Sequence, residues 1–243
     1  MEKKSGTVQT EDSHKIFYDH YHGGHSKIAV IAHGFFNSKD SELIKKAALE
    51  LSCFIDVITF DFRGHGKSEG LFHWTSKEYL DLEAVLRIAN ANYQTTGLIG
   101  FSLGAATSII TVARVNKVDS LIAVSGPTEF EKIDYKFWNL DVENDIFYNL
   151  GDGRKGKGVR PGPFWLKKDK PINVVKDIKI PVLYIHGEDD WVILPWHSER
   201  LYENTISKKH IIKISGGSHA EYLMRFNADE FIEAIRSWFK ETL

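Results

Sequence analysis

Short apolar runs alternate with longer amphipathic segments along most of this chain, and this alternation constrains its fold more than any other feature. The apolar runs have the length of buried strands, and the amphipathic segments repeat their apolar residues at helical spacing. The apolar runs are KIAVIAHG, DVITFDFRG, GLIGF, VDSLIAVSG, PVLYIHG and HIIKIS. Strands that alternate with helices in this way predict βαβ units and a mainly parallel sheet.

Two parts of the chain depart from this alternation. The segments TVQT and KIFYDHY at the start predict a hairpin. Between Pro127 and about Val175 the chain is too long for a simple connection, and it has too many aromatic residues for a disordered linker. We therefore expect one core formed by residues 1–126 and 176–243, with residues 127–175 inserted as a small lid over the sheet.

The segment GLIGFSLGAATSII passes from an expected strand to an expected helix at Ser102, with Gly100 and Gly104 on either side. Strand, Gly-x-Ser-x-Gly and helix together are the context of a nucleophile elbow. Glycine removes Cβ atoms where the strand and helix backbones approach each other. The turn also leaves the main-chain N–H of Leu103 free to face an oxyanion. A serine that only caps the helix is the alternative interpretation, so the hypothesis of a nucleophile depends on its partners.

A serine nucleophile needs a base, and the base needs an acid that orients it. In folds with this elbow, the acid and then the histidine follow later in the chain. Two later strand ends supply such residues: YIHGEDDWV carries Asp189 and Asp190, and IKISGGSHAEY carries His219. The order Ser102, Asp190, His219 therefore fits a catalytic triad.

Four segments in order, AHGFFNS, FDFRGHGKSEG, GFSLGA and HGEDDWVILP, with GGSHAEY after them, resemble the α/β-hydrolase superfamily. The resemblance is to its small lidded serine hydrolases of the carboxylesterase, cinnamoyl-esterase and serine-aminopeptidase types, and it covers nearly the whole chain outside the insertion. It implies an α/β-hydrolase fold, with a mostly parallel sheet of eight strands flanked by helices and a small lid after strand six.

Carried over residue by residue, the resemblance implies that Ser102 is the nucleophile and His219 the general base. The acid of this family stands four residues after the histidine of HGxxD, which is Asp190 here, and Asp189 is the neighbouring alternative. The oxyanion hole would be formed by the main-chain N–H groups of Phe35 and Leu103.

The resemblance implies similar supporting roles for three polar residues near these motifs. His33 precedes the nucleophile in the chain and is expected to brace the oxyanion loop. Arg63 and His65 are expected to hold loops together rather than to react.

The function implied by the resemblance is hydrolysis of small to medium acyl or aryl carboxylic esters through an acyl-enzyme, without a cofactor. Four aromatic residues are expected to line the substrate pocket: Trp138, Phe164, Trp165 and Trp191. The alternative is that they pack inside the lid or against the last helix. On the same fold, an amidase, a thioesterase, a monoacylglycerol lipase and a carbon–carbon bond hydrolase are alternatives. Haloalkane dehalogenases are disfavoured because they have aspartate at the place of Ser102. A ligand-binding receptor is the alternative from another class, and repeated turnover would distinguish it from an enzyme.

Histidines and a cysteine outside these motifs are interpreted as structural. His20, His22 and His25 lack the spacing of a recognised metal-ligand set, so we expect a solvated hairpin tip turned by Gly23–Gly24 and no metal. Cys53, the one cysteine, lies in the apolar run CFIDVITF, and we expect it to be buried.

The charge and hydropathy of the chain bear on its partners and location. With 31 Lys and Arg against 33 Asp and Glu, the net charge of −2 gives no electrostatic case for binding nucleic acid. No run of apolar residues is long enough to span a membrane, and the polar N-terminal segment lacks the apolar core of a signal peptide. We expect a cytoplasmic protein that acts on a small molecule, and the oligomeric state is not predicted. Four basic residues of the insertion are expected at a solvated lid tip: Arg154, Lys155, Lys157 and Arg160.

Overall fold

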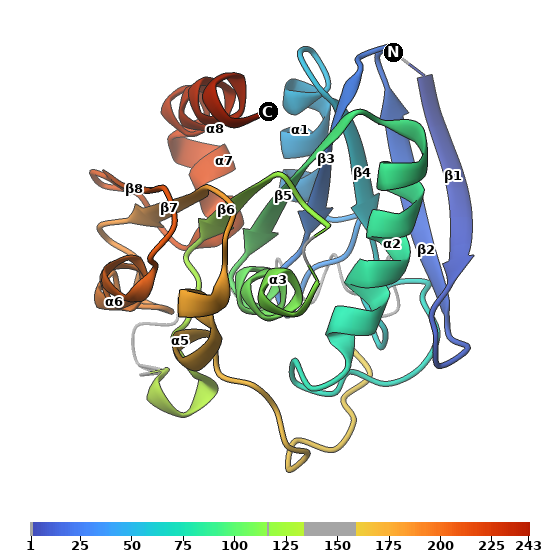
Figure 1. Ribbon diagram of the computed structural model, residues 1–243, viewed down its shortest axis with the longest axis horizontal. Helices are drawn as coiled ribbons and strands as arrows, with labels where there is room; N and C mark the ends of the chain where they lie inside the picture. Colours follow the sequence, from blue (N-terminus) through green and yellow to red (C-terminus); the bar gives the residue numbers. More distant parts are fainter. Residues whose placement is uncertain (1, 116, 134–158) are drawn as a thin grey trace.

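The computed structural model describes residues 2–115, 117–133 and 159–243, which form one eight-stranded sheet with helices on both faces (Figure 1). The strands are β1 (Glu2–Gln9), β2 (Lys15–His22), β3 (Lys27–Ala32), β4 (Asp56–Phe60), β5 (Thr95–Phe101), β6 (Ser120–Val124), β7 (Val182–Gly187) and β8 (Lys209–Ile214). They are arranged in the order β1-β2-β4-β3-β5-β6-β7-β8. The pairs β1–β2 and β2–β4 are antiparallel and the remaining neighbours are parallel, so the predicted mostly parallel sheet of eight strands is confirmed.

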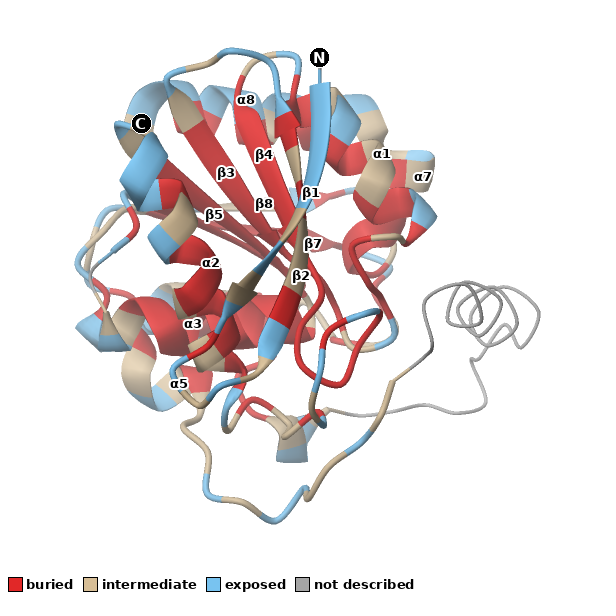
Figure 2. Ribbon diagram, turned by 90° about the vertical axis from the view of Figure 1, so that its right-hand side faces the viewer, coloured by how far each residue is buried: buried red, intermediate tan, exposed pale blue. Residues whose placement is uncertain are grey.

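The helices cover the sheet in two layers, each with its own apolar core (Figures 1 and 2). On one face lie α1 (Glu42–Leu51), α7 (Leu223–Phe226) and α8 (Ala228–Thr242). On the other face lie α2 (Glu78–Asn92), α3 (Leu103–Arg114), α5 (Pro171–Val174) and α6 (Trp196–Asn204). Short 3-10 helices follow β6 and β8 and precede β7: η1 (Phe130–Lys132), η5 (Ala220–Tyr222) and η4 (Val175–Asp177).

The central strands are continuously apolar because both of their faces are buried. In β3, Ile28 and Val30 pack into the core under α2 and α3, while Ala29 and Ile31 pack into the core under α1 and α8. Successive side chains of a strand point to opposite faces, which explains this division. Because β3 and β5 to β8 run parallel, their carboxyl ends meet at one edge of the sheet, where the loops that follow them come together.

The expected burial of Cys53 is wrong. The cysteine is exposed, in the turn between α1 and β4, and its Sγ lies 3.7 Å from the carbonyl oxygen of Leu49. The apolar run belongs to the sheet only from Asp56 onward, so the first residues of CFIDVITF form a connection rather than a strand.

The insertion after β6 is only partly described. Residues 134–158 lie outside the described residues, so the division into core and lid stays a prediction. The segment from Arg160 to Gly162 runs beside the loop after β4, where the N–H of Phe72 donates to the carbonyl of Arg160 at 2.9 Å. Among the helices that the structure describes, none is both long and apolar enough to cross a bilayer.

Candidate active site

Ser102 lies at the corner between β5 and α3 in a left-handed conformation, with φ 52° and ψ −112°. The two flanking glycines are sites of close backbone approach. A Cβ at Gly100 would lie 2.6 Å from the Cα of Ala105, and a Cβ at Gly104 would lie 2.1 Å from the carbonyl oxygen of Ala32. The predicted reason for these glycines, close approach of strand and helix, is therefore confirmed.

His219 follows β8 and meets Ser102 across the edge of the sheet, although 117 positions separate them in the chain. Its Nε2 lies 3.0 Å from the Oγ of Ser102. The next residue, Ala220, has φ 46°, and its N–H donates to the Oγ of Ser125 at 3.1 Å. This hydrogen bond ties the histidine loop to the residue that follows β6, and so fixes where the imidazole lies.

Asp190 is buried beside the other nitrogen of the imidazole. The Nδ1 of His219 lies 2.8 Å from Oδ2 of Asp190, and the N–H groups of Val192 and Ile193 donate to Oδ1. Burial alone would raise the pKa of Asp190, but the charge of His219 and hydrogen bonds from His186 and His219 outweigh it. The pKa of Asp190 therefore lies below its ordinary value, and the carboxylate is ionised at neutral pH.

The neighbouring Asp189 does not reach the imidazole. It is exposed, and its N–H donates to the carbonyl of Gly217 at 2.9 Å. The structure thus brings Ser102, His219 and Asp190 together.

The loop after β3 lies directly against Ser102, because a Cβ at Gly34 would come 3.5 Å from the Cβ of Ser102. The Nδ1 of His33 lies 2.7 Å from the carbonyl oxygen of Gly34, which also accepts from the N–H of Asn37. In a planar trans peptide the N–H points away from the preceding carbonyl. The N–H of Phe35 is therefore directed opposite to His33.

The contacts of His33 fix the orientation of the peptide between Gly34 and Phe35. His33 is fully buried, its Nε2 accepts from the N–H of Phe62 at 3.1 Å, and its Nδ1 faces the carbonyl of Gly34. Burial and the neighbouring His65 hold the pKa of His33 well below its usual value, so the ring stays neutral. His65 in turn places Nε2 2.5 Å from the carbonyl oxygen of Phe35.

The two predicted oxyanion donors are available for hydrogen bonds. Within the described part of the chain, the N–H groups of Phe35 and Leu103 have no acceptor. The carbonyl of Ser102 accepts from Ala105 and Ala106 inside α3, so the Leu103 N–H belongs to the free donors at the start of that helix.

The sequence did not predict a hydrogen bond that joins the loop of Phe35 to the loop of His219. Asn37 donates from Nδ2 to Oε1 of Glu221 at 2.6 Å, and both side chains are buried. Asn37 lies in the loop of Phe35, and Glu221 lies two residues after His219. Their places inside AHGFFNS and GGSHAEY were the available signal, but a contact across 184 positions is visible only in the fold.

Three of the four predicted substrate-lining residues lie in the described part of the chain. Phe164 and Trp165 are 66% and 74% exposed and contact each other, while Trp191 is half-buried. Trp138 lies outside the described residues. Their roles stay predictions.

A different aromatic group flanks the loop after β3 that contains Phe35. The ring of Phe35 lies 5.1 Å from that of Trp74 and 5.2 Å from that of Phe72, and Trp74 also meets Phe130 at 6.2 Å. Trp74 and Thr75 have φ values of 57° and 74°, which are strained for such residues. The sequence FHWTS after the RGHGKS turn contained these rings, but nothing in it indicated that they turn toward Phe35.

The side chains of Arg63 and Arg160 connect segments that are distant in the sequence through ion pairs and hydrogen bonds. Arg63 is fully buried and forms ion pairs with Asp12 and Asp81 at 2.7 and 2.8 Å. Arg160 donates to the carbonyls of Gly66 and Ser68, so the expectation that it is solvated at a lid tip is wrong. The other residues of that basic loop, Arg154, Lys155 and Lys157, lie outside the described residues.

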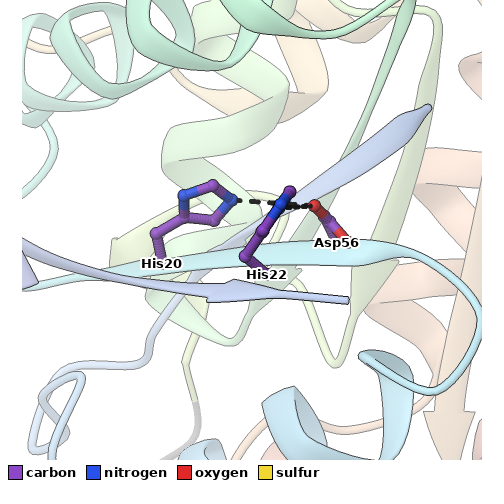
Figure 3. Close-up of side chains that lie close together, drawn as sticks. All are labelled: His20, His22 and Asp56. Carbon is purple, nitrogen blue, oxygen red and sulfur yellow. Dashed lines mark hydrogen bonds and ion pairs between the residues drawn. The ribbon is translucent and has the colours of Figure 1, made fainter. Parts of the chain in front are cut away.

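The expected hairpin turned by Gly23–Gly24 is wrong, although His22 and both glycines are exposed as expected. β2 pairs with β4 and not with β3, so Gly23–Gly24 connects two strands that are not neighbours. The imidazoles of His20 and His22 lie instead beside the buried carboxylate of Asp56 (Figure 3).

Comparison with known proteins identifies the architecture. A family model described as the alpha/beta hydrolase fold matches residues 29–145. The uncharacterized protein YqkD of Bacillus subtilis (strain 168) is 29% identical over 206 residues, which are 79% of this chain and 64% of YqkD. The chain thus spans less than two thirds of the length of that relative.

Two solved esterases have the same fold. Esterase Pf2001 of Pyrococcus furiosus matches with a TM-score of 0.80 at 22% identity, over 99% of this chain and 93% of that chain. Esterase RhEst1 of Rhodococcus sp. ECU1013 also matches with a TM-score of 0.80, at 18% identity, over 98% of this chain and 99% of that chain.

Proposed function

Because the chain belongs to the α/β-hydrolase superfamily, we propose that it is a serine hydrolase that cleaves carboxylic esters of small to medium acyl or aryl groups. The observation that carries the proposal is the line of hydrogen-bond contacts from Ser102 Oγ through both nitrogens of His219 to Asp190. A hydroxyl held 3.0 Å from an imidazole that is oriented by a buried carboxylate is the arrangement that activates a serine.

In this mechanism His219 takes the proton of Ser102 as Oγ attacks the carbonyl carbon of the ester. The imidazolium then gives that proton to the leaving alcohol, and an acyl-enzyme on Ser102 remains. Water next gives a proton to His219 and attacks the acyl carbon. The carboxylic acid leaves, and Ser102 recovers its proton from His219. Asp190 keeps the imidazole in one tautomer and stabilises its charged form.

The oxyanion that forms at each attack would be bound by the N–H groups of Leu103 and Phe35. Their lack of acceptors within the described chain, and the hold of His33 on the adjoining peptide, support this role. Removing one such donor typically reduces turnover by about 10²- to 10³-fold.

The preference for small to medium acyl or aryl groups is supported by the aromatic rings beside Phe35. The half-buried ring of Trp74 contacts that of Phe35, and Phe36 is 46% exposed on the same loop, while Phe72 is fully buried behind them. The two solved esterases with this fold support ester rather than amide substrates.

Repeated hydrolysis of p-nitrophenyl acetate and butyrate tests the proposal. We expect release of many equivalents of p-nitrophenol per chain, and Ser102→Ala should lower turnover by about 10⁵- to 10⁶-fold. Ser108→Ala is the matched control, because Ser108 is buried in the same helix α3 and its hydroxyl has no partner in the described chain. Release that stops at one equivalent would indicate a binding protein instead.

A further inference from the structure

A second cluster of polar side chains lies far from Ser102, at the amino ends of the parallel strands. His20 and His22 are two residues apart on β2 and therefore project from the same face of the strand. Asp56 begins β4, the neighbour of β2, and Tyr93 follows the end of α2. Figure 3 shows both imidazoles directed at the carboxylate.

The donor atoms of this cluster converge on one point. Nδ1 of His22 lies 2.5 Å and Nε2 of His20 3.9 Å from Oδ2 of Asp56, and the three atoms all lie within 4.8 Å of one another. Four ligands at zinc distances of about 2.0–2.2 Å would be separated by about 3.3 Å. The observed separations bracket that value, so small side-chain rotations would bring the three atoms to a common ion.

The carboxylate of Asp56 is buried and held in an orientation that would suit a bound cation. Asp56 is fully buried, and its Oδ1 is fixed by the main-chain N–H groups of Gly23 and His25, which leaves Oδ2 directed at the imidazoles. In the described part of the chain, no lysine or arginine comes within ion-pair distance of it. Main-chain hydrogen bonds of this kind fix the orientation of a ligating carboxylate.

We propose that Nε2 of His20, Nδ1 of His22 and Oδ2 of Asp56 bind a divalent transition-metal ion of the Zn²⁺ type. Two imidazoles and one carboxylate are a ligand set that zinc accepts, with water in the fourth position. The phenol oxygen of Tyr93 lies 2.7 Å from Nε2 of His20 and 2.6 Å from Oδ2 of Asp56. The hydroxyl thus lies where the ion would bind, and the half-buried ring of Tyr93 would turn outward on binding.

The ion would join β2 to β4, because its ligands come from both strands. The site is structural rather than catalytic, since it lies at the opposite end of the strands from Ser102. Binding would therefore stabilise the folded chain by mass action without being required for turnover.

Equilibrium dialysis of the full chain against Zn²⁺, with the bound metal counted, tests the site. We expect one ion per chain and a higher melting temperature with Zn²⁺. His20→Gln and His22→Gln should each weaken binding by more than about 10-fold. His25→Gln is the matched control, because the ring of His25 contacts the carbonyl of Ser52 rather than Asp56, and it should bind as the parent does.

Two further variants, Tyr93→Phe and His20→Gln/His22→Gln, test the ligand assignment. Tyr93→Phe should bind Zn²⁺ at least as tightly as the parent, because the hydroxyl that occupies the centre is gone. Absence of stoichiometric binding, or one ion retained in the double variant His20→Gln/His22→Gln, would overturn the proposal. Loss of binding in Tyr93→Phe would overturn the three-ligand set.

Discussion

Ser102 is held with φ 52°, a conformation that costs a residue with a side chain about 1–3 kcal/mol. Main-chain hydrogen bonds on both sides of Ser102 offset this cost. Its N–H donates to the carbonyl of Val124 at 2.8 Å, and its carbonyl accepts from the N–H groups of Ala105 and Ala106 in the first turn of α3. The same strain directs Oγ at His219 instead of toward the helix. Strain at this single residue is thus part of how the site is formed.

If Ser102, His219 and Asp190 act as a triad, as proposed, their ionisation sets the pH profile of activity. The pKa of Asp190 is held below its ordinary value, so the carboxylate stays ionised throughout the range from pH 5 to 9. The acid limb therefore belongs to His219, which cannot accept a proton once it is protonated. We expect kcat/KM for p-nitrophenyl butyrate to fall tenfold per pH unit on that limb. A profile that stays level from pH 8 to pH 5 would show that no base of this kind acts.

Among the secondary-structure elements, the packing of α3 against β3 fixes where Ser102 lies. The backbone of Gly104 lies so close to Ala32 that a Cβ would come 2.1 Å from a carbonyl oxygen, and main-chain atoms cannot yield as a flexible side chain can. The elbow therefore depends on glycine for packing as much as for its turn.

We expect Gly104→Ala to destabilise the fold by about 3 kcal/mol or more, because α3 must move away from the sheet. Thermal or urea unfolding measures this loss. Gly34→Ala is the matched control, since the nearest atoms to its Cβ would lie at an ordinary 3.5 Å, and its stability should be close to that of the parent. Equal stability of Gly104→Ala and Gly34→Ala would contradict the packing argument.

The hydrogen bond between Asn37 and Glu221 joins the loop after β3 to the loop of His219, so both residues are expected to position the proposed site. Asn37→Ala and Glu221→Ala should each lower kcat by about 10-fold with little change in KM, because a buried partner is left unpaired. Glu221→Gln should keep most of the activity, since its amide oxygen can still accept from Asn37.

The double variant separates this role from a general loss of structure. If the two side chains act through their hydrogen bond, Asn37→Ala/Glu221→Ala should be no slower than either single variant. Fully multiplied losses, or no recovery in Glu221→Gln, would count against positioning.

The elements that the sequence pattern predicted are those with strong periodicity or a distinctive turn. Buried strands such as β3 and β5 and the corner at Ser102 follow from apolar runs and glycine placement. The neighbours of His22 could not be predicted, because the strand order places β4 beside β2 and brings Asp56 to it from 34 positions away. Trp74 was missed for a related reason: its direction depends on a strained loop conformation that sequence periodicity does not encode.

At the scale of the whole molecule, buried charges link distant segments and make stability depend on pH. Arg63 joins the β1–β2 turn to α2 through Asp12 and Asp81. Burial, together with the neighbouring charge of Asp81, raises the pKa of Glu78 to about 7. An acid whose pKa is raised on folding binds more protons in the folded chain than in the unfolded chain. Stability therefore falls as the pH rises from about 4.5 through about 7.

Glu78→Gln should remove this contribution, on the order of 1–3 kcal/mol. We expect the free energy of unfolding of the parent, measured in urea, to decline more between pH 5.5 and pH 8 than that of Glu78→Gln. The exposed Glu230→Gln in α8 is the control and should behave as the parent does. Identical declines in all three proteins would exclude Glu78 as the source.

Mass spectrometry of the protein after treatment with a fluorophosphonate tests whether Ser102 is an activated nucleophile, because the reagent bonds to serines that have been activated. We predict one adduct per chain, mapped to the peptide that contains Ser102, absent from Ser102→Ala and strongly reduced in His219→Ala. An adduct on another residue, or equal labelling of the parent and Ser102→Ala, would show that Ser102 is not the nucleophile.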